Sequence, residues 1–344
     1  MLAAEYLDRP VSGQEMLYGA IQGMVQALGD PYTSFLPPEV NEAVTSSLNG
    51  VYEGIGAELG LDDGQLIVVA PLDGSPAKAA GVQPGDKILR IEDESTVGIS
   101  ITDAVAKIRG TAGTVSTLTL QRGSGEPFVV HIKREKITIS SVTWKDEGDG
   151  VVYIRLSRFG SDTNTEWNKA VAEINVGMDN ISAIVFDLRG NPGGYLLSSV
   201  HVAGEFMRNE VVLYQETAIG NQIPLDTTRV GSFEGVPLYI LIDQGSASAS
   251  EILAAALRDH AEAVLIGQTS FGKGTIQDAK EFADGSGLHL TVAKWLTSSK
   301  EWVHEVGLEP DVVVERTQED LEATRDVQLE TALDMARNGL TELE

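Results

Sequence analysis

The stretch LYILIDQGSASASE, residues 238–251, organises the rest of the chain. Its first five residues, Leu238–Ile242, form a continuous apolar run with β-branched and aromatic members, which predicts a buried strand. The run stops at Asp243–Gly245, and Ile252–Leu257 continues with a helical pattern. The small residues between strand and helix allow a tight turn that a ligand can approach closely. The stretch therefore predicts a strand, a polar turn and a helix in succession.

Ser248 and Glu251 have the spacing of a capping box, which places Ser248 at the N-terminus of the following helix. Free backbone amides and the helix dipole favour negative charge at this end, which suits a serine that passes through an oxyanion intermediate. An ordinary helix N-cap produces the same pattern. A second group is therefore needed to favour catalysis over a structural role.

Lys273 supplies such a group. It lies between two glycines in SFGKGTIQ, residues 270–277, 25 residues after Ser248. The glycines allow close approach to another segment, and burial beside apolar neighbours would lower the lysine pKa towards the range of a general base. A serine and a lysine can replace the serine–histidine–acid triad. A triad that uses His260 or His289 is the alternative.

Three ordered motifs carry a resemblance to a known family. They are DLRGNPGG (187–194), GSASASE (245–251) and SFGKGTIQ (270–277). With the region near residues 50–135, they resemble the C-terminal processing peptidases, or tail-specific proteases, which are PDZ-containing serine peptidases. The resemblance covers nearly the whole chain. It implies a dyad in which Ser248 is the nucleophile, Lys273 is the base and Gln277 orients the lysine.

The DLRGNPGG motif continues from Ala183–Leu188, which reads as a buried strand. Paired glycines after a strand can present backbone amides to an anion, and the resemblance implies that this loop supplies one oxyanion donor. Gly193 and Gly194 are both candidates for that donor. The amide of Ala249, next to the nucleophile, is expected to be the second. A loop that only connects a strand to a helix is the structural alternative. Arg189 in the same loop is a candidate for a structural role, in which it would pair with an acid.

A glycine-rich turn precedes the apolar run Leu66–Val69. The turn consists of Gly54, Ile55, Gly56 and Ala57. Backbone amides of such a turn can hold a peptide carboxylate, and the adjacent strand edge can accept a peptide as an added strand. Ser75–Asp86 resembles the helix and turn of protease PDZ domains. Arg109 matches the family arginine that links the peptide-bound PDZ domain to the active site, with a solvated arginine at a helix end as the alternative.

The two ends of the chain read as helical. Residues 12–48 carry apolar side chains at helical spacing, interrupted by Gly29–Tyr32 and by Pro37–Pro38. In relatives this region contributes to dimerisation, so a homodimer contact and packing on the chain's own core both remain open. Residues 318–340 read as a charged amphipathic helix, which indicates a docked terminus or a dimer contact.

Strands and helices alternate from residue 137 onward, which is typical of an α/β fold. Val151–Leu156 and Leu288–Leu296 read as strands, and Trp167–Ile174 reads as a helix. The prediction is an α/β fold with α+β elements. Its domains are an N-terminal helical region (1–49), a PDZ-like β-rich domain (50–135) and an α/β peptidase core of the tail-specific protease type with a C-terminal helix (136–344).

One segment departs from the family pattern. Relatives carry a proline and a glycine in the hairpin that follows Leu288–Leu296, whereas this chain has Thr297–Trp302. Because the hairpin is expected to lie outside the dyad, we expect the departure to alter local geometry and contacts and not catalysis.

The composition limits the function classes. The 344 residues include 51 acidic and 25 basic side chains, for a formal net charge of −26. This balance disfavours nucleic acid, whose binding needs a clustered basic surface, and disfavours adhesion to anionic membranes. The sequence has no cysteine, which excludes disulfides, thiol catalysis and thiolate metal sites. It has no HExxH motif and its acidic residues are scattered, so no metal and no cofactor is expected.

The cellular location of the protein is indicated more by the family resemblance than by its composition. No run of about 18 apolar residues occurs, so no direct membrane insertion is expected. Met1–Glu5 lacks the basic start and apolar stretch of a signal peptide. Family members are usually exported or membrane-tethered by an N-terminal segment. The resemblance therefore implies an extracytoplasmic, cell-envelope location for the full-length protein, either periplasmic or tethered to the membrane.

The combined interpretation is a serine endopeptidase that cleaves proteins at or near their C-terminal tails. The PDZ-like domain would recognise the tail, and Ser248 with Lys273 would perform the chemistry. The expected partners are the tails of protein or peptide substrates. The alternative is a non-catalytic PDZ scaffold whose α/β unit only presents the peptide groove. The presence of both dyad residues favours the enzyme.

Overall fold

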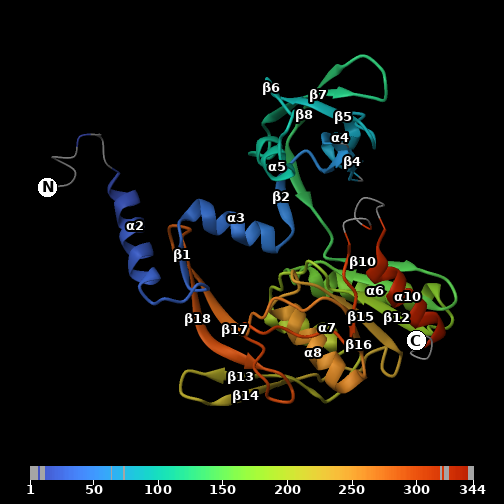
Figure 1. Cartoon of the computed structure of the whole chain (residues 1–344). Coiled ribbons are helices and arrows are strands. Elements are labelled where there is room, and N and C mark those ends of the chain that lie inside the picture. Colours follow the sequence, from blue (N-terminus) through green and yellow to red (C-terminus); the bar gives the residue numbers. More distant parts are fainter. Residues whose placement is uncertain are drawn as a thin grey trace. The chain divides into compact units, whose positions relative to one another are not determined.

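The computed structural model describes residues 12–62, 64–72, 74–317 and 325–339, together with residues 7 and 320. The described residues form two compact units (Figure 1). Residues 50–139 form one unit, and the segments on either side of it together form the other. The opening Met1–Glu5 lies outside the described residues.

A six-stranded sheet forms the centre of the larger unit, with the order β10-β11-β12-β15-β16-β19. The strands are β10 (Val142–Asp146), β11 (Val151–Leu156), β12 (Ala183–Asp187), β15 (Leu238–Ile242), β16 (Val264–Gly267) and β19 (Val312–Val313). The strands from β11 to β19 pair in parallel, and only β10 is antiparallel to its neighbour. The apolar runs predicted as buried strands therefore lie side by side as β11, β12 and β15.

Helices cover both faces of this sheet. They are α6 (Thr163–Gly177), α7 (Leu196–Ala203), α8 (Ala249–Ala261) and α10 (Val327–Asn338). Successive residues of a strand point to opposite faces, so Ile184 and Phe186 pack in the core with α6, α7 and α8, whereas Ala183 and Val185 pack in the core with α10. The result is a three-layered α/β/α arrangement, and it confirms the α/β fold class.

A second, antiparallel sheet completes the larger unit. Its order is β1-β18-β13-β14, and β17 also pairs with β18. These strands are β1 (Ser34–Leu36), β13 (Val211–Thr217), β14 (Gln222–Asp226), β17 (Thr275–Glu281) and β18 (Gly287–Leu296). Because β17 begins two residues after Lys273, this sheet fixes one end of the lysine loop.

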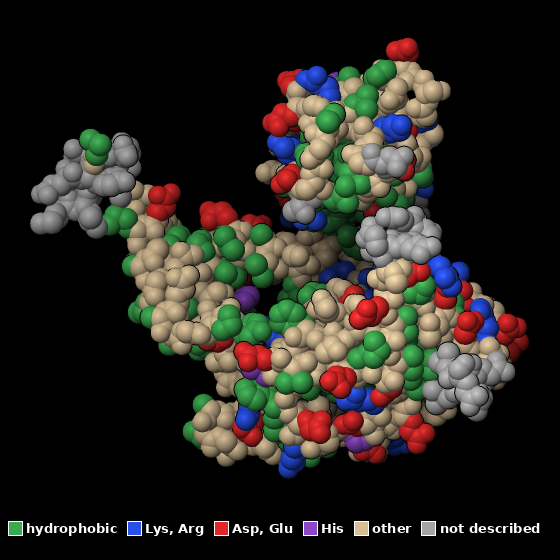
Figure 2. All heavy atoms as spheres, viewed as in Figure 1, with side chains coloured by type: hydrophobic (Ala, Val, Ile, Leu, Met, Phe, Trp, Pro, Cys, Tyr) green, Lys and Arg blue, Asp and Glu red, His purple; other side chains and the backbone are tan. Residues whose placement is uncertain are grey.

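The N-terminal helices are α2 (Gly13–Gln26) and α3 (Pro38–Leu48). The ring of Tyr18 packs 5.6 Å from that of Phe35 on β1, and its hydroxyl donates to Asp284 over 2.9 Å. Even so, Val25 is the one residue of α2 described as buried. Large apolar side chains remain exposed on both helices (Figure 2): Met16, Leu17, Met24, Val40 and Val44.

The smaller unit is a β-rich fold around one core. Its larger sheet has the order β3-β4-β5-β7-β8, with β6 paired to β5, and β2 pairs separately with β9. The strands are β2 (Val51–Gly54), β3 (Ala57–Asp62), β4 (Gln65–Pro71), β5 (Lys87–Ile91), β6 (Glu94–Ser95), β7 (Val115–Gln121), β8 (Phe128–Lys133) and β9 (Glu135–Thr138). The helices are α4 (Pro76–Ala79) and α5 (Ile101–Ile108).

The predicted C-terminal helix is only partly described. Helix α10 covers Val327–Asn338, while residues 318–319, 321–324 and 340 lie outside the described residues. Ala332 and Met335 are buried against the central sheet, so this helix is docked. Across the described ranges, no helix combines the length and apolarity that a bilayer crossing requires.

Candidate active site

Ser248 is the N-cap residue of α8, directly after the turn that follows β15. Its backbone has φ 55° and ψ −115°, a conformation that costs a non-glycine residue roughly 1–3 kcal/mol and persists only where the surroundings enforce it. The flanking serines provide part of that enforcement. The Ser246 hydroxyl donates to Leu188 O over 2.8 Å, and the Ser250 hydroxyl donates to Asn191 O over 2.9 Å. Both flanking serines are buried, whereas Ser248 is half-buried.

Two tryptophan side chains hold the backbone around Lys273 in place. The indole of Trp295 donates to Lys273 O over 2.8 Å, and the indole of Trp302 donates to Gly274 O over 2.9 Å. The ammonium group lies 5.3 Å from the centre of the Tyr32 ring, and within the described ranges it forms no ion pair. Burial lowers the pKa of Lys273 below its ordinary value, although the negative charges of Asp30 and Glu251 act in the opposite direction.

The serine and lysine segments are joined by one carboxylate. Glu251 Oε2 accepts from Ser248 N over 2.7 Å and from Lys273 N over 2.9 Å. A backbone bond from Phe271 N to Ser246 O, 3.0 Å long, also joins the two segments. Among the described residues, no hydrogen bond links the Ser248 hydroxyl to Lys273 Nζ. Catalytic hydrogen bonds are often long in a free enzyme and shorten when substrate binds, so the arrangement is compatible with a dyad.

Gln277 lies on β17, next to a bulge at Ile276 in the pairing with β18. Its amide nitrogen donates to Thr275 Oγ1 over 2.9 Å and to Thr291 Oγ1 over 3.1 Å. No hydrogen bond between Gln277 and Lys273 is present in the described part of the chain. These two bonds use the nitrogen of the side-chain amide and leave its oxygen as the group that could accept from the lysine.

The DLRGNPGG loop lies against the serine. A Cβ atom on Gly193 would come within 2.7 Å of Ala247 O and 2.9 Å of Ser248 Cβ, so only glycine allows this approach. Gly193 N already donates to Asn191 Oδ1 over 2.9 Å. By contrast, the amides of Gly194 and Ala249 have no acceptor among the described residues. These two N–H groups are therefore the ones free to bind a developing oxyanion.

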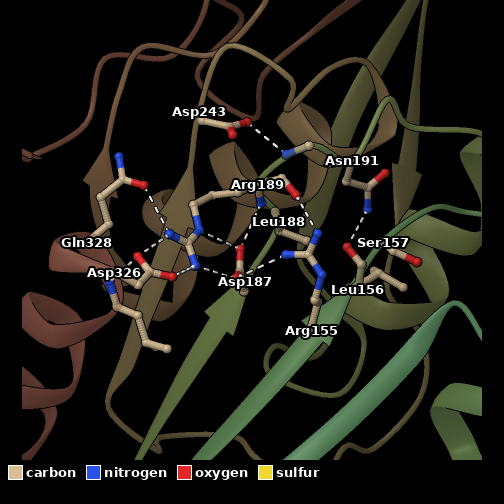
Figure 3. Close-up of polar contacts among 12 residues, drawn as sticks. Arg155, Leu156, Ser157, Asp187, Leu188, Arg189, Asn191, Asp243, Asp326 and Gln328 are labelled. Atoms are coloured by element: carbon tan, nitrogen blue, oxygen red, sulfur yellow. Dashed lines mark hydrogen bonds and ion pairs between the residues drawn. The ribbon is translucent and has the colours of Figure 1, made fainter. Parts of the chain in front are cut away.

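Charged side chains brace the same loop (Figure 3). The guanidinium of Arg189 binds Asp187 with distances of 2.7 and 3.0 Å, and binds Asp326, which precedes α10, with distances of 2.7 and 2.9 Å. Arg155 donates to Arg189 O, and Asp243 accepts from Gly190 N over 2.8 Å. Although burial acts to raise the pKa of Asp326, the hydrogen bonds and charge of Arg189 lower it below its ordinary value. Arg189 is thus structural, as the sequence suggested.

In the smaller unit, a groove of about 350 Å³ lies beside the glycine-rich turn. Its lining includes Gly54, Ile55, Gly56 and Ala57, together with Leu72, Val105, Ile108 and Arg109. The strand β3 pairs with β4 on one side only, so its other edge is open to an added strand within the described residues. The amides of Ile55 and Gly56 have no acceptor among the described residues. The guanidinium carbon of Arg109 lies 4.8 Å from the centre of the Tyr52 ring.

Comparison with known proteins identifies both units. Residues 150–314 match Peptidase family S41, and residues 67–122 match the PDZ domain. The carboxy-terminal processing proteases CtpB and CtpA of Bacillus subtilis (strain 168) are 37% and 35% identical to the chain. These alignments cover 92% and 88% of this chain. The larger unit therefore contains a region of peptidase family S41, and the smaller unit contains a PDZ domain. We call them the S41 unit and the PDZ unit. The resemblance to C-terminal processing peptidases is thereby confirmed.

The S41 assignment extends to solved structures. A photosystem II D1 C-terminal processing protease aligns over 90% of this chain and 84% of its own, with a TM-score of 0.54 and 28% identity. The chain spans 66% and 64% of the lengths of the two Bacillus relatives.

The structure excludes one of the two histidine alternatives and leaves the other open. His260 lies twelve residues after Ser248, near the other end of α8, which is about 18 Å at the helical rise per residue. His260 instead contacts Val211 O and Glu210. His289 lies on β18, where burial lowers its pKa and the charge of Lys273 lowers it further. His289 is therefore a neighbour of the lysine, and His260 is excluded as the base.

Several residues of the S41 site carry no signal in the sequence alone. Trp302 belongs to the segment that departs from the family pattern, yet its indole holds the lysine loop and its ring stacks on His304 at 4.9 Å. This departure therefore reaches the lysine loop, which was not expected. The positive φ of Ser248 and the second acid on Arg189 were likewise not foreseen. Each depends on residues distant in sequence, which local patterns do not bring together.

Proposed function

We propose that this protein is a serine endopeptidase that cleaves other proteins at or near their C-terminal tails. The observation that carries the proposal is the pairing of two unusual groups. Ser248 sits in an enforced, rarely adopted backbone conformation at a helix N-terminus. Lys273, on the segment joined to it through Glu251, has a lowered pKa and no ion pair among the described residues. A nucleophile and a desolvated base are what acyl transfer requires.

The reaction follows from these groups. Neutral Lys273 takes the proton of the Ser248 hydroxyl as Oγ bonds to the scissile carbonyl carbon. The carbonyl oxygen becomes an oxyanion that accepts hydrogen bonds from the Gly194 and Ala249 amides. The C–N bond then breaks, and the Lys273 ammonium returns its proton to the leaving amine. Water attacks the resulting ester with Lys273 again as base, which releases the acid and restores Ser248.

The choice of Gly194 over Gly193 as a donor rests on hydrogen bonding. Gly193 N is already bonded to Asn191, and breaking that bond would offset part of the stabilisation of the oxyanion. In our proposal Gln277 accepts from the Lys273 ammonium through its free amide oxygen. Its nitrogen is fixed by two threonines, which supports this orientation of the amide.

Substrate selection is assigned to the PDZ domain. An apolar tail residue would enter the groove, the terminal carboxylate would bind the amides of Ile55 and Gly56, and the tail backbone would pair with the open edge of β3. We assign Gly54 and Ala57 to the same carboxylate-binding turn. Arg109 is proposed to couple tail binding to peptidase activity. Its stacking on Tyr52 beside the groove supports a role in sensing an occupied groove.

The proposed partners are substrate tails and a second copy of the chain. A homodimer contact through α2 and α3 is supported by their exposed apolar side chains. We place the full-length protein in the cell envelope, because the family relationship favours a protease that acts on exported proteins.

Ser248→Ala tests the proposal directly. An unfolded protein is incubated with the enzyme, and the cleavage sites are mapped by mass spectrometry. We expect cleavage near the C-terminus and a loss on the order of 10⁶-fold in kcat for Ser248→Ala, because only oxyanion binding and orientation remain.

Ser246→Ala and Ser250→Ala are the matched controls, because they remove hydroxyls of the same turn that bond to carbonyl groups. They should lower thermal stability and reduce kcat far less than Ser248→Ala does, because each variant keeps the nucleophile. Full activity of Ser248→Ala would refute the assignment. Tail-peptide binding by a wild-type protein that cleaves nothing would favour the scaffold alternative.

A further inference from the structure

Glu251 makes more contacts than a helix cap requires. In a capping box, the glutamate has one partner, the N–H of the capping residue. Here the oxygen that accepts from Ser248 N, Oε2, also accepts from Lys273 N. The other oxygen, Oε1, accepts from the Ser270 hydroxyl and from Gly272 N, both over 2.6 Å. Three of the four donors therefore belong to the lysine loop.

The carboxylate of Glu251 is fully buried and has no ion pair within the described part of the chain. A buried charge of this kind is costly unless its oxygens are satisfied. The four donors and the N-terminus of α8 meet that requirement. Ser270 extends the connection, because its hydroxyl also accepts from Leu308 N over 2.7 Å. Loss of the carboxylate would leave buried donors of both segments unsatisfied at once.

We propose that Glu251 is a positioning residue that holds the Ser248 nucleophile and the Lys273 base in register through one buried carboxylate. The inference rests on the proposed function and adds a residue to it. Glu251 does not touch the substrate. It acts by fixing the backbone on which the two catalytic groups are carried. A misplacement of about 1 Å between reacting groups can cost roughly 10²-fold in rate.

The charge of Glu251 gives the proposal a specific signature. Four titratable groups face the Lys273 ammonium: the Asp30 and Glu251 carboxylates, the Tyr32 phenol and the His289 imidazole. The two carboxylates hold the lysine pKa up against the effect of burial. Removing one of them must lower that pKa further. A glutamate that only capped a helix at a distance from the lysine would have no such effect.

Glu251→Gln in the full chain is the test. The glutamine side chain keeps one acceptor oxygen and replaces the other with an NH₂ group. That NH₂ group would face the two donors that the lost oxygen accepted from, and it cannot accept from either. We expect kcat for a tail peptide to fall about 10²-fold, KM to stay within threefold, and the midpoint of the rise of kcat with pH to move to lower pH. A kcat within twofold of wild type, or an unchanged midpoint, would overturn the proposal.

Glu205→Gln is the matched control. Glu205 is equally buried and accepts from Arg229 and from Ser232 N, but these partners belong to a different loop of the S41 unit. It should lower thermal stability without moving the pH midpoint. Glu251→Asp, which keeps the charge and shortens the reach, should lower kcat and leave the midpoint near that of wild type. This second variant keeps the test decisive if Glu251→Gln does not fold.

A measurement without proteolysis separates this inference from the proposed function. Acylation of Lys273 by a small amine-reactive reagent, followed by mass spectrometry across a pH series, reports the pKa of the lysine directly. The midpoint should be lower in Glu251→Gln than in wild type and unchanged in Glu205→Gln. A shifted acylation midpoint in a chain that cleaves nothing would retain the role of Glu251 and reject the peptidase. An unshifted midpoint in an active peptidase would reject the role of Glu251 and retain the proposed function.

Discussion

The S41 unit and the PDZ unit use buried charge for different purposes. In the S41 unit, Glu251 and Asp187 are fully buried and act on the loops that carry the candidate catalytic groups. In the PDZ unit, the fully buried Asp86 pairs with the half-exposed Arg122 and with Gln83 N, so it fixes a turn. The PDZ groove itself is lined mainly by apolar side chains and free strand edge. The difference matches the proposed roles, in which one unit holds reacting atoms in position and the other binds a substrate tail.

Lys273→Arg gives the largest expected effect and tests whether the S41 unit needs a lysine that can lose its proton, as well as a positioned side chain. Arginine keeps the charge but cannot lose its proton in a protein, so it cannot act as the base. We expect kcat to fall on the order of 10⁴-fold, the upper end of what general-base catalysis supplies. In wild type, kcat should rise with pH through the lowered pKa of Lys273, because the neutral amine is the active form. Steady-state assays across a pH series measure both quantities.

Lys294→Arg is the control for that substitution, since Lys294 pairs with Glu216 over 2.7 Å and arginine keeps the positive charge of that pair. It should behave as wild type. An active Lys273→Arg enzyme would remove the lysine from the mechanism and make His289 the candidate base.

Gly193→Ala has an intermediate expected effect and compares the two units directly. The new Cβ would collide with Ala247 O and Ser248 Cβ, and the φ of +94° is strained for alanine. Because the loop must move away from the serine, the proposed oxyanion donor, the N–H of Gly194, moves with it. We expect kcat to fall about 10²–10³-fold, which is the usual cost of losing one donor.

Gly81→Ala in the PDZ unit is the matched control. Gly81 has a φ of +80°, but a Cβ there would meet nothing within 4 Å. This variant should lose stability in thermal unfolding and keep its kcat. Equal losses of kcat in the two variants would show that backbone strain by itself, and not the contact with Ser248, limits the reaction.

Arg109→Ala has the smallest expected effect and concerns the PDZ unit alone. Loss of the stacking on Tyr52 should lower the cleavage rate of a substrate with a free tail about two- to fivefold, as expected for an exposed cation–π contact. The same substrate amidated at its C-terminus should be cleaved more slowly by wild type and show little further loss in the variant. If wild type cleaves both tails equally, the PDZ unit serves as a passive tether at most.

Local pattern predicted those features whose signal lies within a few residues. The apolar run Leu238–Ile242 is a buried strand, and Ser248 caps the helix that follows, as its spacing with Glu251 indicated. The open strand edge of the PDZ unit and the paired glycines near Ser248 could also be predicted, from the order of the motifs along the chain. The roles of Ser248, Lys273 and Gln277 remain predictions.

Other features depend on contacts that spacing does not reveal. Glu251 reaches Ser270, Gly272 and Lys273 only because β16 and the loop after it return the chain to the start of α8. The sequence indicated that Arg189 needs an acid, but Asp187 is two residues away and Asp326 is 137 residues away. Such a pairing follows from the docking of α10, which is a property of the whole packed unit.

The distance in sequence between Arg189 and Asp326 has a consequence for biosynthesis. A ribosome that adds about 5–20 residues per second needs roughly 7–27 s to pass from one residue to the other. The serine loop and then the lysine loop are synthesised within that interval, before the acid and the helix that complete the brace on the DLRGNPGG segment. Residues 50–139 have by then already left the ribosome. The growing chain therefore completes its PDZ unit early and its S41 unit last.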